Sequence, residues 1–453
     1  MAENKLERIV GAPADALDKT VNFSENLVKN EGVKRAGDYW KNLGPGLTTG
    51  ASDDDPSGIA TYSQAGAQYG FSLLWLAAFT FPLMAIVQEM CARIGLVTGR
   101  GLAGNIRIYF PKWVLYVCTA LLVFANVLNI GADLGAMAKS TQLLFPKFSF
   151  GTLILAFAIV GLVLQIYVSY EKYARYLKYL ALILLSYILS AVSVHLNVKE
   201  LLKNAVVPVL SFSKNQMFLV TGILGTTISP YLFFWQTSQE VEESILKGQT
   251  TIKLREEAVS NKEIGLMRQD VWSGMFLSNI VMFFIIAACA VTLFTHGVTN
   301  IGTAADAAKA LRPIAGDQAY LLFALGVIGT GMLAIPVLAG SASYAISECF
   351  GWKTGLYRKL KEANAFYGMI ILATLVGVAI NFAGIDPIKA LILSAVVNGL
   401  VAPVVLVLIV LLSRNKKVMG ERVNHPIVTV FGVLITGLMA AAGIATIFFA
   451  IVK

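Results

Sequence analysis

Long apolar segments recur along this chain, and they restrict its fold more than any other feature of the sequence. A stretch of about 18 or more apolar residues is long enough to cross the hydrocarbon core of a membrane as a helix. Eleven such segments follow the N-terminal region: 43–68, 72–95, 113–138, 149–170, 174–194, 215–239, 270–296, 318–350, 364–382, 386–412 and 426–452. We therefore expect an all-α integral membrane protein with eleven transmembrane helices.

The composition supports this fold class. Hydrophobic residues make up 57% of the 453 residues and charged residues only 14%, whereas about 25% are charged in a typical soluble domain. The first residues, MAENKLERIV, lack the basic-then-apolar order and the cleavage site of a secretory signal. We expect residues 1–42 to form a cytoplasmic tail, and the protein to lie in the plasma or inner membrane.

The basic residues are distributed unevenly between alternate loops. With the N-terminus inside, the cytoplasmic tail, loops and adjoining helix ends hold 27 of the 36 lysines and arginines, as the positive-inside rule predicts. The net charge of +9 therefore reflects topology, not a nucleic-acid surface. We expect membrane lipid and a small cation as the partners, no nucleic acid, and a monomer.

The cysteines and histidines show no pattern of an enzyme or of a resident metal site. The four cysteines form no CxxC pair, and the three histidines fall near helix ends or in loops. No nucleophile has a nearby base or a histidine cluster that could activate a metal. We expect no catalytic residue and no cofactor.

Two apolar segments carry matching interruptions. Pro56 breaks the first and Pro230 the sixth, 174 residues apart, and proline with nearby glycine unwinds a helix locally. Paired breaks in two five-helix halves are typical of inverted-repeat transporters with a site at the bilayer midplane. We expect one repeat over 43–194, an inverted second repeat over 215–412, and an eleventh helix in 426–453.

The first break, DDDPSG, places three carboxylates at membrane depth. A carboxylate there costs several kcal/mol and is usually functional, so Asp55 is the primary candidate for binding a cation. Asp53 and Asp54 either face a water-filled vestibule or attract the ion while it is still hydrated.

The run GPGLTTGASDDDPSGIATYSQAGAQYGFSLLW resembles the first helix of the NRAMP family of divalent-metal transporters. Further similarity lies in AIVQEMCARIGLVTGRGLA, NIGADLGAM, LYRK and LILSAVV, so that the resemblance covers roughly residues 40–412. It implies a leucine-transporter-like 5+5 inverted repeat with broken helices 1 and 6, which moves divalent metal by alternating access.

The departures from the family pattern concern the metal ligands. The resemblance implies a site formed by Asp55, Gly58, Thr226 and Ser229, where Gly58 replaces the family's Asn and Ser229 its Met. Thioether sulfur favours soft metals, whereas oxygen ligands favour Mg²⁺ and also suit Mn²⁺. The set resembles that of NRAMP-related magnesium transporters, so we expect Mg²⁺, with Mn²⁺ also carried.

A second departure concerns protons. Tyr231 stands where the family has a His, and Ala136 replaces an acidic residue, although Asp133 remains. Because His titrates near neutral pH and Tyr does not, we expect transport without tight proton coupling. Gln236 and Glu240 are candidates for lining an exit path.

Other polar residues in the helices have simpler interpretations. Asn126 and Asn129 are expected to make interhelical hydrogen bonds, and Glu89 either to be solvated or to pair with Arg93 one turn later. Two alternatives to metal uptake stay open: a transporter of the same fold for another solute, including an organic one, and a membrane sensor that binds without transporting. The residues also leave open the choice between Mg²⁺ and Mn²⁺ and the roles of the N-terminal tail and of the 240–270 loop.

Overall fold

The computed structural model describes residues 44–168, 189, 198–312 and 316–451. Residues Pro45–Lys453 form one compact unit, and its described part contains helices and no strand. The α-helices are α3 (Pro45–Asp53), α4 (Pro56–Tyr69), α5 (Trp75–Thr98), α6 (Leu102–Tyr109), α7 (Lys112–Leu144), α8 (Phe150–Tyr167), α11 (Val198–Val206), α12 (Lys214–Thr227), α13 (Pro230–Leu246), α14 (Ile252–Ala258), α15 (Asn261–Thr292), α16 (Ala304–Ala308), α18 (Ala319–Phe350), α19 (Asn364–Ile380), α20 (Pro387–Ser413), α21 (Lys416–Met419) and α22 (Pro426–Ile451). Short 3₁₀ turns cover Gly70–Leu73, Phe294–His296, Lys309–Leu311, Gly316–Gln318 and Gly420–Arg422.

Most of the predicted membrane spans are present as helices. Eight described helical segments are long and apolar enough to cross a membrane, and α19 is a shorter apolar helix. The first predicted span is divided into α3 and α4. The fifth, 174–194, lies almost entirely outside the described residues, so the count of eleven stays a prediction.

Both predicted breaks are confirmed. Asp54 and Asp55 separate α3 from α4, and Ile228 and Ser229 separate α12 from α13. In each case an extended N-cap residue is followed by a proline at the first helical position. Proline lacks the N–H that would close the preceding turn, and its fixed φ suits the start of a new helix. The sequence thus restarts both helices in the middle of a span.

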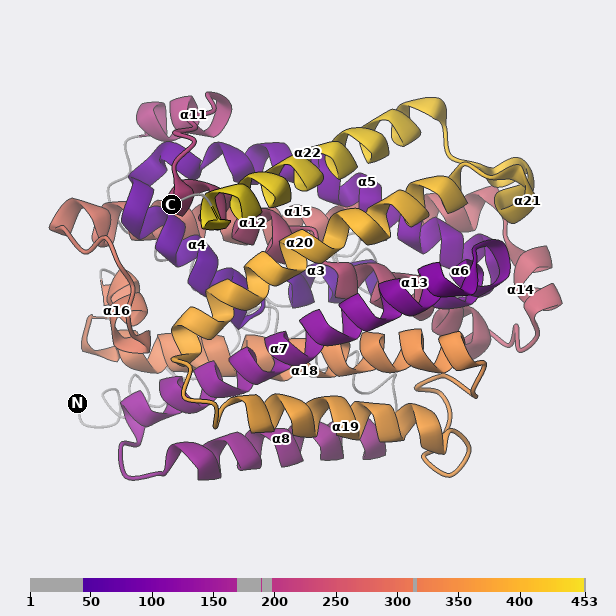
Figure 1. Cartoon of the computed structure of the whole chain (residues 1–453), viewed down its shortest axis with the longest axis horizontal. Coiled ribbons are helices and arrows are strands. Elements are labelled where there is room, and N and C mark those ends of the chain that lie inside the picture. Colours follow the sequence, from indigo (N-terminus) through magenta and orange to yellow (C-terminus); the bar gives the residue numbers. More distant parts are fainter. Residues whose placement is uncertain (1–43, 169–188, 190–197, 313–315, 452–453) are drawn as a thin grey trace, which may run out of the picture. The chain divides into compact units, whose positions relative to one another are not determined.

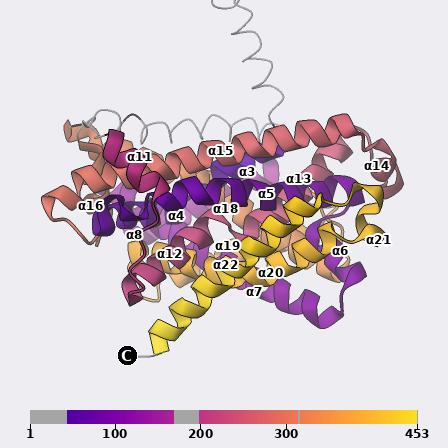
Figure 2. The same cartoon turned by 90° about the horizontal axis from the view of Figure 1, so that it is seen from above.

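The broken helices lie in the interior of the helical unit (Figure 1). In the most apolar stretch of the α12–α13 span 94% of the residues are buried, against 22% in α8 and 28% in α22. In Figure 2, α15 runs alongside α3, and the two helices touch through glycines. A Cβ on Gly50 would lie 2.2 Å from the carbonyl oxygen of Gly274, so only glycine permits this approach.

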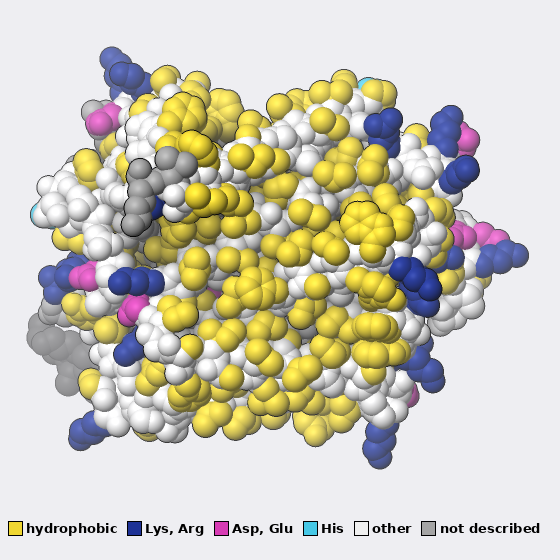
Figure 3. Space-filling view, in the orientation of Figure 1, with side chains coloured by type: hydrophobic (Ala, Val, Ile, Leu, Met, Phe, Trp, Pro, Cys, Tyr) yellow, Lys and Arg dark blue, Asp and Glu magenta, His cyan; other side chains and the backbone are white. Residues whose placement is uncertain are grey.

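The surface agrees with a membrane location. Figure 3 shows apolar side chains across the middle of one face, with Lys and Arg mainly toward its edges. The short helices α6, α14 and α21 lie at one end of the unit, and α11 and α16 at the other, in both ribbon views. Elements that follow the second, sixth and tenth predicted spans therefore share one side, as the positive-inside pattern requires.

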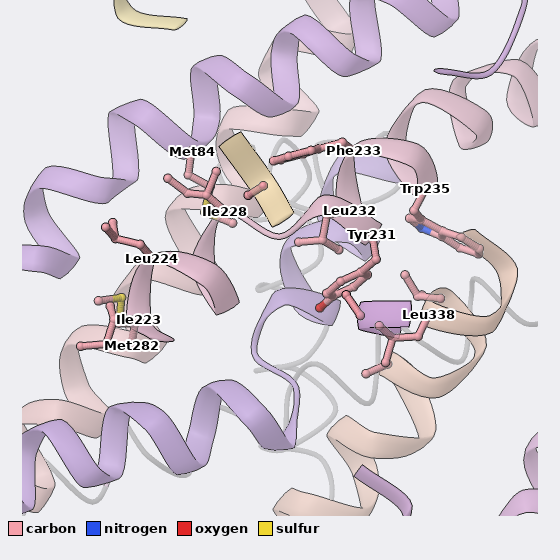
Figure 4. Packing of buried hydrophobic residues seen from close by; sticks show 14 of the residues in the cluster. Met84, Ile223, Leu224, Ile228, Tyr231, Leu232, Phe233, Trp235, Met282 and Leu338 are labelled. Carbon is pink, nitrogen blue, oxygen red and sulfur yellow. The ribbon is translucent and has the colours of Figure 1, made fainter. Parts of the chain in front are cut away.

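Buried apolar side chains surround the second break. Figure 4 shows Tyr231, Leu232 and Phe233 on the first turn of α13 among such side chains, with Ile228 beside Met84. Each of these five is at most 1% exposed. Close packing of this kind holds the non-helical backbone away from lipid, where an unsatisfied peptide group would be costly.

Candidate ion site at the two helix breaks

Asp55 is held by three donors at the start of α4. Its Oδ1 accepts hydrogen bonds from the Gly58 N–H at 2.8 Å and from Ser57 Oγ at 2.6 Å. Its Oδ2 accepts a hydrogen bond from Nδ2 of Asn129 in α7 at 2.7 Å. In turn, Asn129 Oδ1 accepts a hydrogen bond from Ser394 Oγ of α20 at 2.6 Å. The carboxylate is therefore fixed in orientation and joined to two other helices.

The other predicted ligands lie directly beside one another. A Cβ on Gly58 would be 3.1 Å from Thr226 Oγ1, so α4 and α12 are in close contact at this point. The hydroxyl of Ser229 donates to the carbonyl oxygens of Thr226 and Gly225, both at 2.7 Å. In this closed arrangement the candidate ligands satisfy each other. A cation would have to replace the Ser229 hydroxyl at the Thr226 carbonyl, and their role as ligands stays a prediction.

Asp53 and Asp54 are fully buried beside Asp55. Oδ2 of Asp53 accepts a hydrogen bond from Ser278 Oγ of α15 at 2.6 Å, whereas Asp55 bonds to Asn129 of α7. Oδ1 of Asp53 and both carboxylate oxygens of Asp54 have no hydrogen-bond partner in the described part of the chain. The vestibule role expected for this pair would require an open conformation.

Asp133 lies one turn after Asn129 on α7, and therefore on the same face of that helix. It is buried, and its two carboxylate oxygens also lack partners among the described residues. An isolated buried carboxylate is strongly unfavourable unless it is paired, protonated or bound to a cation. Because no described group pairs with Asp54 or Asp133, each carboxylate is either protonated or compensated by a bound cation.

Tyr231 makes a structural contact between the two breaks. Its hydroxyl donates to the carbonyl oxygen of Ser52 at 2.9 Å, and the side chain is 1% exposed. Because the last carbonyls of a helix lack intrahelical partners, this bond satisfies a group that the end of α3 leaves free. Transport without tight proton coupling stays a prediction.

Gln236 and Glu240 lie on α13, C-terminal to the break, and are hydrogen-bonded to each other. Gln236 Oε1 accepts a hydrogen bond from Thr49 Oγ1 at 2.5 Å, and its Nε2 donates to Glu240 Oε1 at 2.9 Å. The Asp270 carboxylate accepts the N–H groups of Gly46 at 2.7 Å and Leu47 at 3.2 Å. The start of α3 is thus clamped between α13 and α15, and lining an exit path stays a prediction for Gln236 and Glu240.

Several residues of this region were not singled out by the sequence. Tyr62 and Thr227 join α4 to α12 through their hydroxyls at 3.1 Å, and Asp270 is 224 residues from its partner Gly46. No local pattern marks such distant contacts. Asn129 was predicted to be an interhelical partner, which is confirmed, but its partner proved to be Asp55.

Two other local predictions are also confirmed. Asn126 donates to the carbonyl oxygen of Leu338 at 2.9 Å, and Glu89 pairs with Arg93 at 2.7 Å. Both residue pairs are explained by packing between or along helices, and neither belongs to the ion site.

The chemistry of the site is that of oxygen donors. Carboxylates, hydroxyls and backbone carbonyls surround the two breaks, and no group of three or more His, Cys, Asp and Glu in the described residues is arranged to hold a metal ion. Oxygen donors suit hard cations. Any ion bound here would therefore be coordinated partly by backbone groups, hydroxyls or retained water.

Divalent metal cation transporters are similar to this chain in sequence. The chain is 26% identical over 404 residues to the divalent metal cation transporter MntH of Aeromonas hydrophila, covering 88% of this chain and 93% of that protein. It is also 26% identical over 413 residues to MntH of Chromohalobacter salexigens, with 90% of each chain covered.

The fold is shared with solved transporters. The crystal structure of the Eremococcus coleocola manganese transporter superposes with a TM-score of 0.70 at 18% identity, covering 92% of this chain and 90% of that one. Mhp1, a nucleobase-cation-symport-1 family transporter, gives a TM-score of 0.54 at 14% identity, with 90% and 91% covered. The leucine-transporter-like architecture is thereby confirmed. Since residues 46–449 match the model of the natural resistance-associated macrophage protein-like family, the chain belongs to the Nramp family.

Proposed function

We propose that this protein takes up a hard divalent cation, Mg²⁺ in the first place and also Mn²⁺, across the plasma or inner membrane by alternating access. It is a multi-pass membrane transporter, not an enzyme. The observation that carries the proposal is the set of buried carboxylate oxygens on Asp53, Asp54 and Asp133 without partners in the described residues, next to the bonded Asp55. A divalent cation would compensate this charge.

The choice of ion rests on the ligand types. Gly58 and Ser229 provide no thioether and no side-chain amide, so the candidate set with Asp55 and Thr226 consists of oxygen atoms. Mg²⁺ prefers oxygen and retains water, which a site with short ligands permits once the breaks separate. Because Gly58 and Thr226 are in close contact, a small ion would require less separation of α4 and α12 than an organic solute.

The energy source follows from the missing His at position 231. An inside-negative potential of 100 mV favours entry of a dication by about 4.6 kcal/mol, twice the value for a single charge. Uptake down this gradient needs no proton. We therefore infer electrogenic transport without tight proton coupling.

The test is influx into proteoliposomes with an inside-negative potential. Mg²⁺ and Mn²⁺ entry and internal pH would be recorded for the intact protein, for Asp55→Ala, and for Asp386→Asn, which removes an exposed carboxylate far along the chain from the breaks. We expect metal entry without acidification, its loss in Asp55→Ala, and near-normal entry in Asp386→Asn.

Two outcomes would contradict the proposal in different ways. Acidification that rises in proportion to metal entry would refute the uncoupled mechanism but leave the cation site in place. Absence of entry of either ion, with folding confirmed by thermal unfolding, would refute cation transport itself.

A further inference from the structure

A polar cavity lies apart from the helix breaks. Its volume is about 470 Å³, and its walls come from the loop after α5, the last turns of α13, α14, the end of α18 and the loop that follows α18. Its charged lining residues are Arg100, Arg255, Lys353, Arg358, Glu242 and Glu348. Figure 1 shows α14 at the end of the unit that also holds α6 and α21, the side expected to be cytoplasmic.

The two carboxylates of the cavity already accept hydrogen bonds from other groups of the protein. Glu242 accepts hydrogen bonds from the Tyr344 hydroxyl and from the N–H groups of Leu356 at 2.8 Å and Tyr357 at 3.1 Å. Glu348 accepts the Gly104 N–H at 2.8 Å. Neither forms an ion pair with a lining cation in the described part of the chain, so both serve to join segments of the backbone.

The cations, in contrast, retain free donors. Arg255 uses Nε for the Gly99 carbonyl at 3.0 Å and Nη1 for two carbonyls at 3.1 Å, while its Nη2 makes no hydrogen bond to a described residue. Arg358 bonds among the described residues only through Nε, to the Thr354 carbonyl at 3.1 Å, and its guanidinium carbon lies 4.8 Å from the centre of the Tyr357 ring. Backbone carbonyls orient these guanidinium groups without neutralising them, and the buried Glu242 carboxylate offsets part of the Arg358 charge.

Ion pairs compensate little of this positive charge. Arg100 pairs with Glu256 at 3.2 Å, and that carboxylate is 46% exposed; among the described residues Arg255, Lys353 and Arg358 have no ion pair. Burial is the main cause that lowers the pKa of Arg255; Arg100 lowers it further, while Tyr357 and Glu256 raise it. A bound anion would act in the same direction as Tyr357 and Glu256.

We propose that this cavity binds a phosphate-bearing anion larger than inorganic phosphate, through Arg100, Arg255, Lys353 and Arg358. Arginine recognises phosphate oxygens with paired N–H donors, and lysine adds a point charge. The volume falls in the range of small-molecule sites, about 300–1,000 Å³. The phosphates could belong to a soluble nucleotide or polyphosphate or to a phospholipid headgroup, which share this chemistry.

Such a ligand would also affect movement of the helices. It would contact α14 and the loop after α18 together, across the end of α13, which belongs to the second broken helix. Alternating access requires one group of helices to move against another. Binding is therefore expected to hold this side closed and to slow transport. This effect on transport rests on the proposed function, whereas the binding of the anion does not depend on it.

The test measures binding directly with the full chain in nanodiscs of phosphatidylcholine and metal-free buffer. ATP and tripolyphosphate would be titrated by calorimetry against the intact protein, Lys353→Gln/Arg358→Gln, and the matched control Lys359→Gln/Lys361→Gln on the same loop. We expect saturable binding that weakens at least tenfold in the first variant and is unchanged in the control. Lys353→Glu, at an exposed position, serves if the first variant does not fold.

A second arm identifies the source of the phosphate. Nanodiscs that contain phosphatidylglycerol or phosphatidylinositol phosphate would be analysed by native mass spectrometry for retained lipid. If soluble phosphates fail to bind but an anionic lipid is retained by the intact protein and lost from Lys353→Gln/Arg358→Gln, the ligand is a headgroup. Failure of both classes to bind, or equal loss in the matched control, would overturn the site, whatever the outcome of the metal-influx assay.

Discussion

At the scale of single residues, the orientation of Asp55 depends on a chain of side chains that ends at Ser394. Asn129→Leu removes the donor to Oδ2 at similar size, and a hydrogen bond to a charged group contributes about 1.5–3 kcal/mol. We expect the apparent affinity for the transported ion to fall about tenfold or more. Ser394→Ala removes only the bond that orients Asn129, so its effect should be smaller.

Metal influx measured against ion concentration for the intact protein and both variants checks this order of apparent affinities. A Ser394→Ala protein that is impaired more than Asn129→Leu would contradict the linkage drawn from the hydrogen bonds. Equal values for all three proteins would mean that Asp55 does not need orientation.

The contact between Gly58 and Thr226 gives a second residue-scale prediction. A Cβ at position 58 would be 3.1 Å from Thr226 Oγ1 and 3.3 Å from the Asp53 carbonyl oxygen, so Gly58→Ala should destabilise the protein by about 1–3 kcal/mol through overpacking. Thr226→Ala removes the nearest atom. In a double-mutant cycle on thermal unfolding, Thr226→Ala should therefore recover part of that loss, and strict additivity would argue against the contact.

At the scale of elements, the closed state depends on glycines between α3 and α15. A Cβ on Gly274 would meet the Gly46 carbonyl oxygen at 2.1 Å, so Gly274→Ala must push α3 away from α15. We expect this variant to expose the start of α3 to solvent. Thr49, which is 0% exposed, would report the change as Thr49→Cys.

Labelling with a membrane-impermeant thiol reagent from the expected cytoplasmic side makes this measurable. Thr49→Cys should be protected alone and labelled at least several-fold faster when combined with Gly274→Ala. The Gly274→Ala protein without the added cysteine is the control, since its four native cysteines are buried. Unchanged protection would show that α3 does not move separately from α15.

At the scale of the whole molecule, the uneven charge distribution predicts the orientation of the protein in the membrane. Lys253 on α14 and Lys417 on α21 lie at one end of the unit, while Lys147 and Lys199 belong to segments expected on the other. In intact cells, Lys147→Cys and Lys199→Cys should react with an impermeant reagent, whereas Lys253→Cys and Lys417→Cys should react only after permeabilisation. The reverse pattern would invert the assigned topology.

The sequence by itself determined the membrane class, nearly all of the spans and both helix breaks. These features follow from local properties: the length of apolar runs and the missing N–H of Pro56 and Pro230 act within a few residues of where they stand. The resemblance carried by DDDPSG also pointed to the family, which the match over residues 46–449 confirms. The pairing of Glu89 with Arg93 could be predicted for the same reason, because the two residues lie within one helical turn.

Only the tertiary structure decided how the carboxylates are used. The three aspartates are adjacent in the sequence, yet their hydrogen bonds differ. Asp55 bonds to α7, Asp53 bonds to α15, and the carboxylate of Asp54 has no hydrogen-bond partner in the described part. Their partners lie 74 and 225 positions away in the chain. Such contacts depend on how whole helices pack, which no local pattern records, and the same holds for the cavity that brings Arg100, Arg255 and Arg358 together.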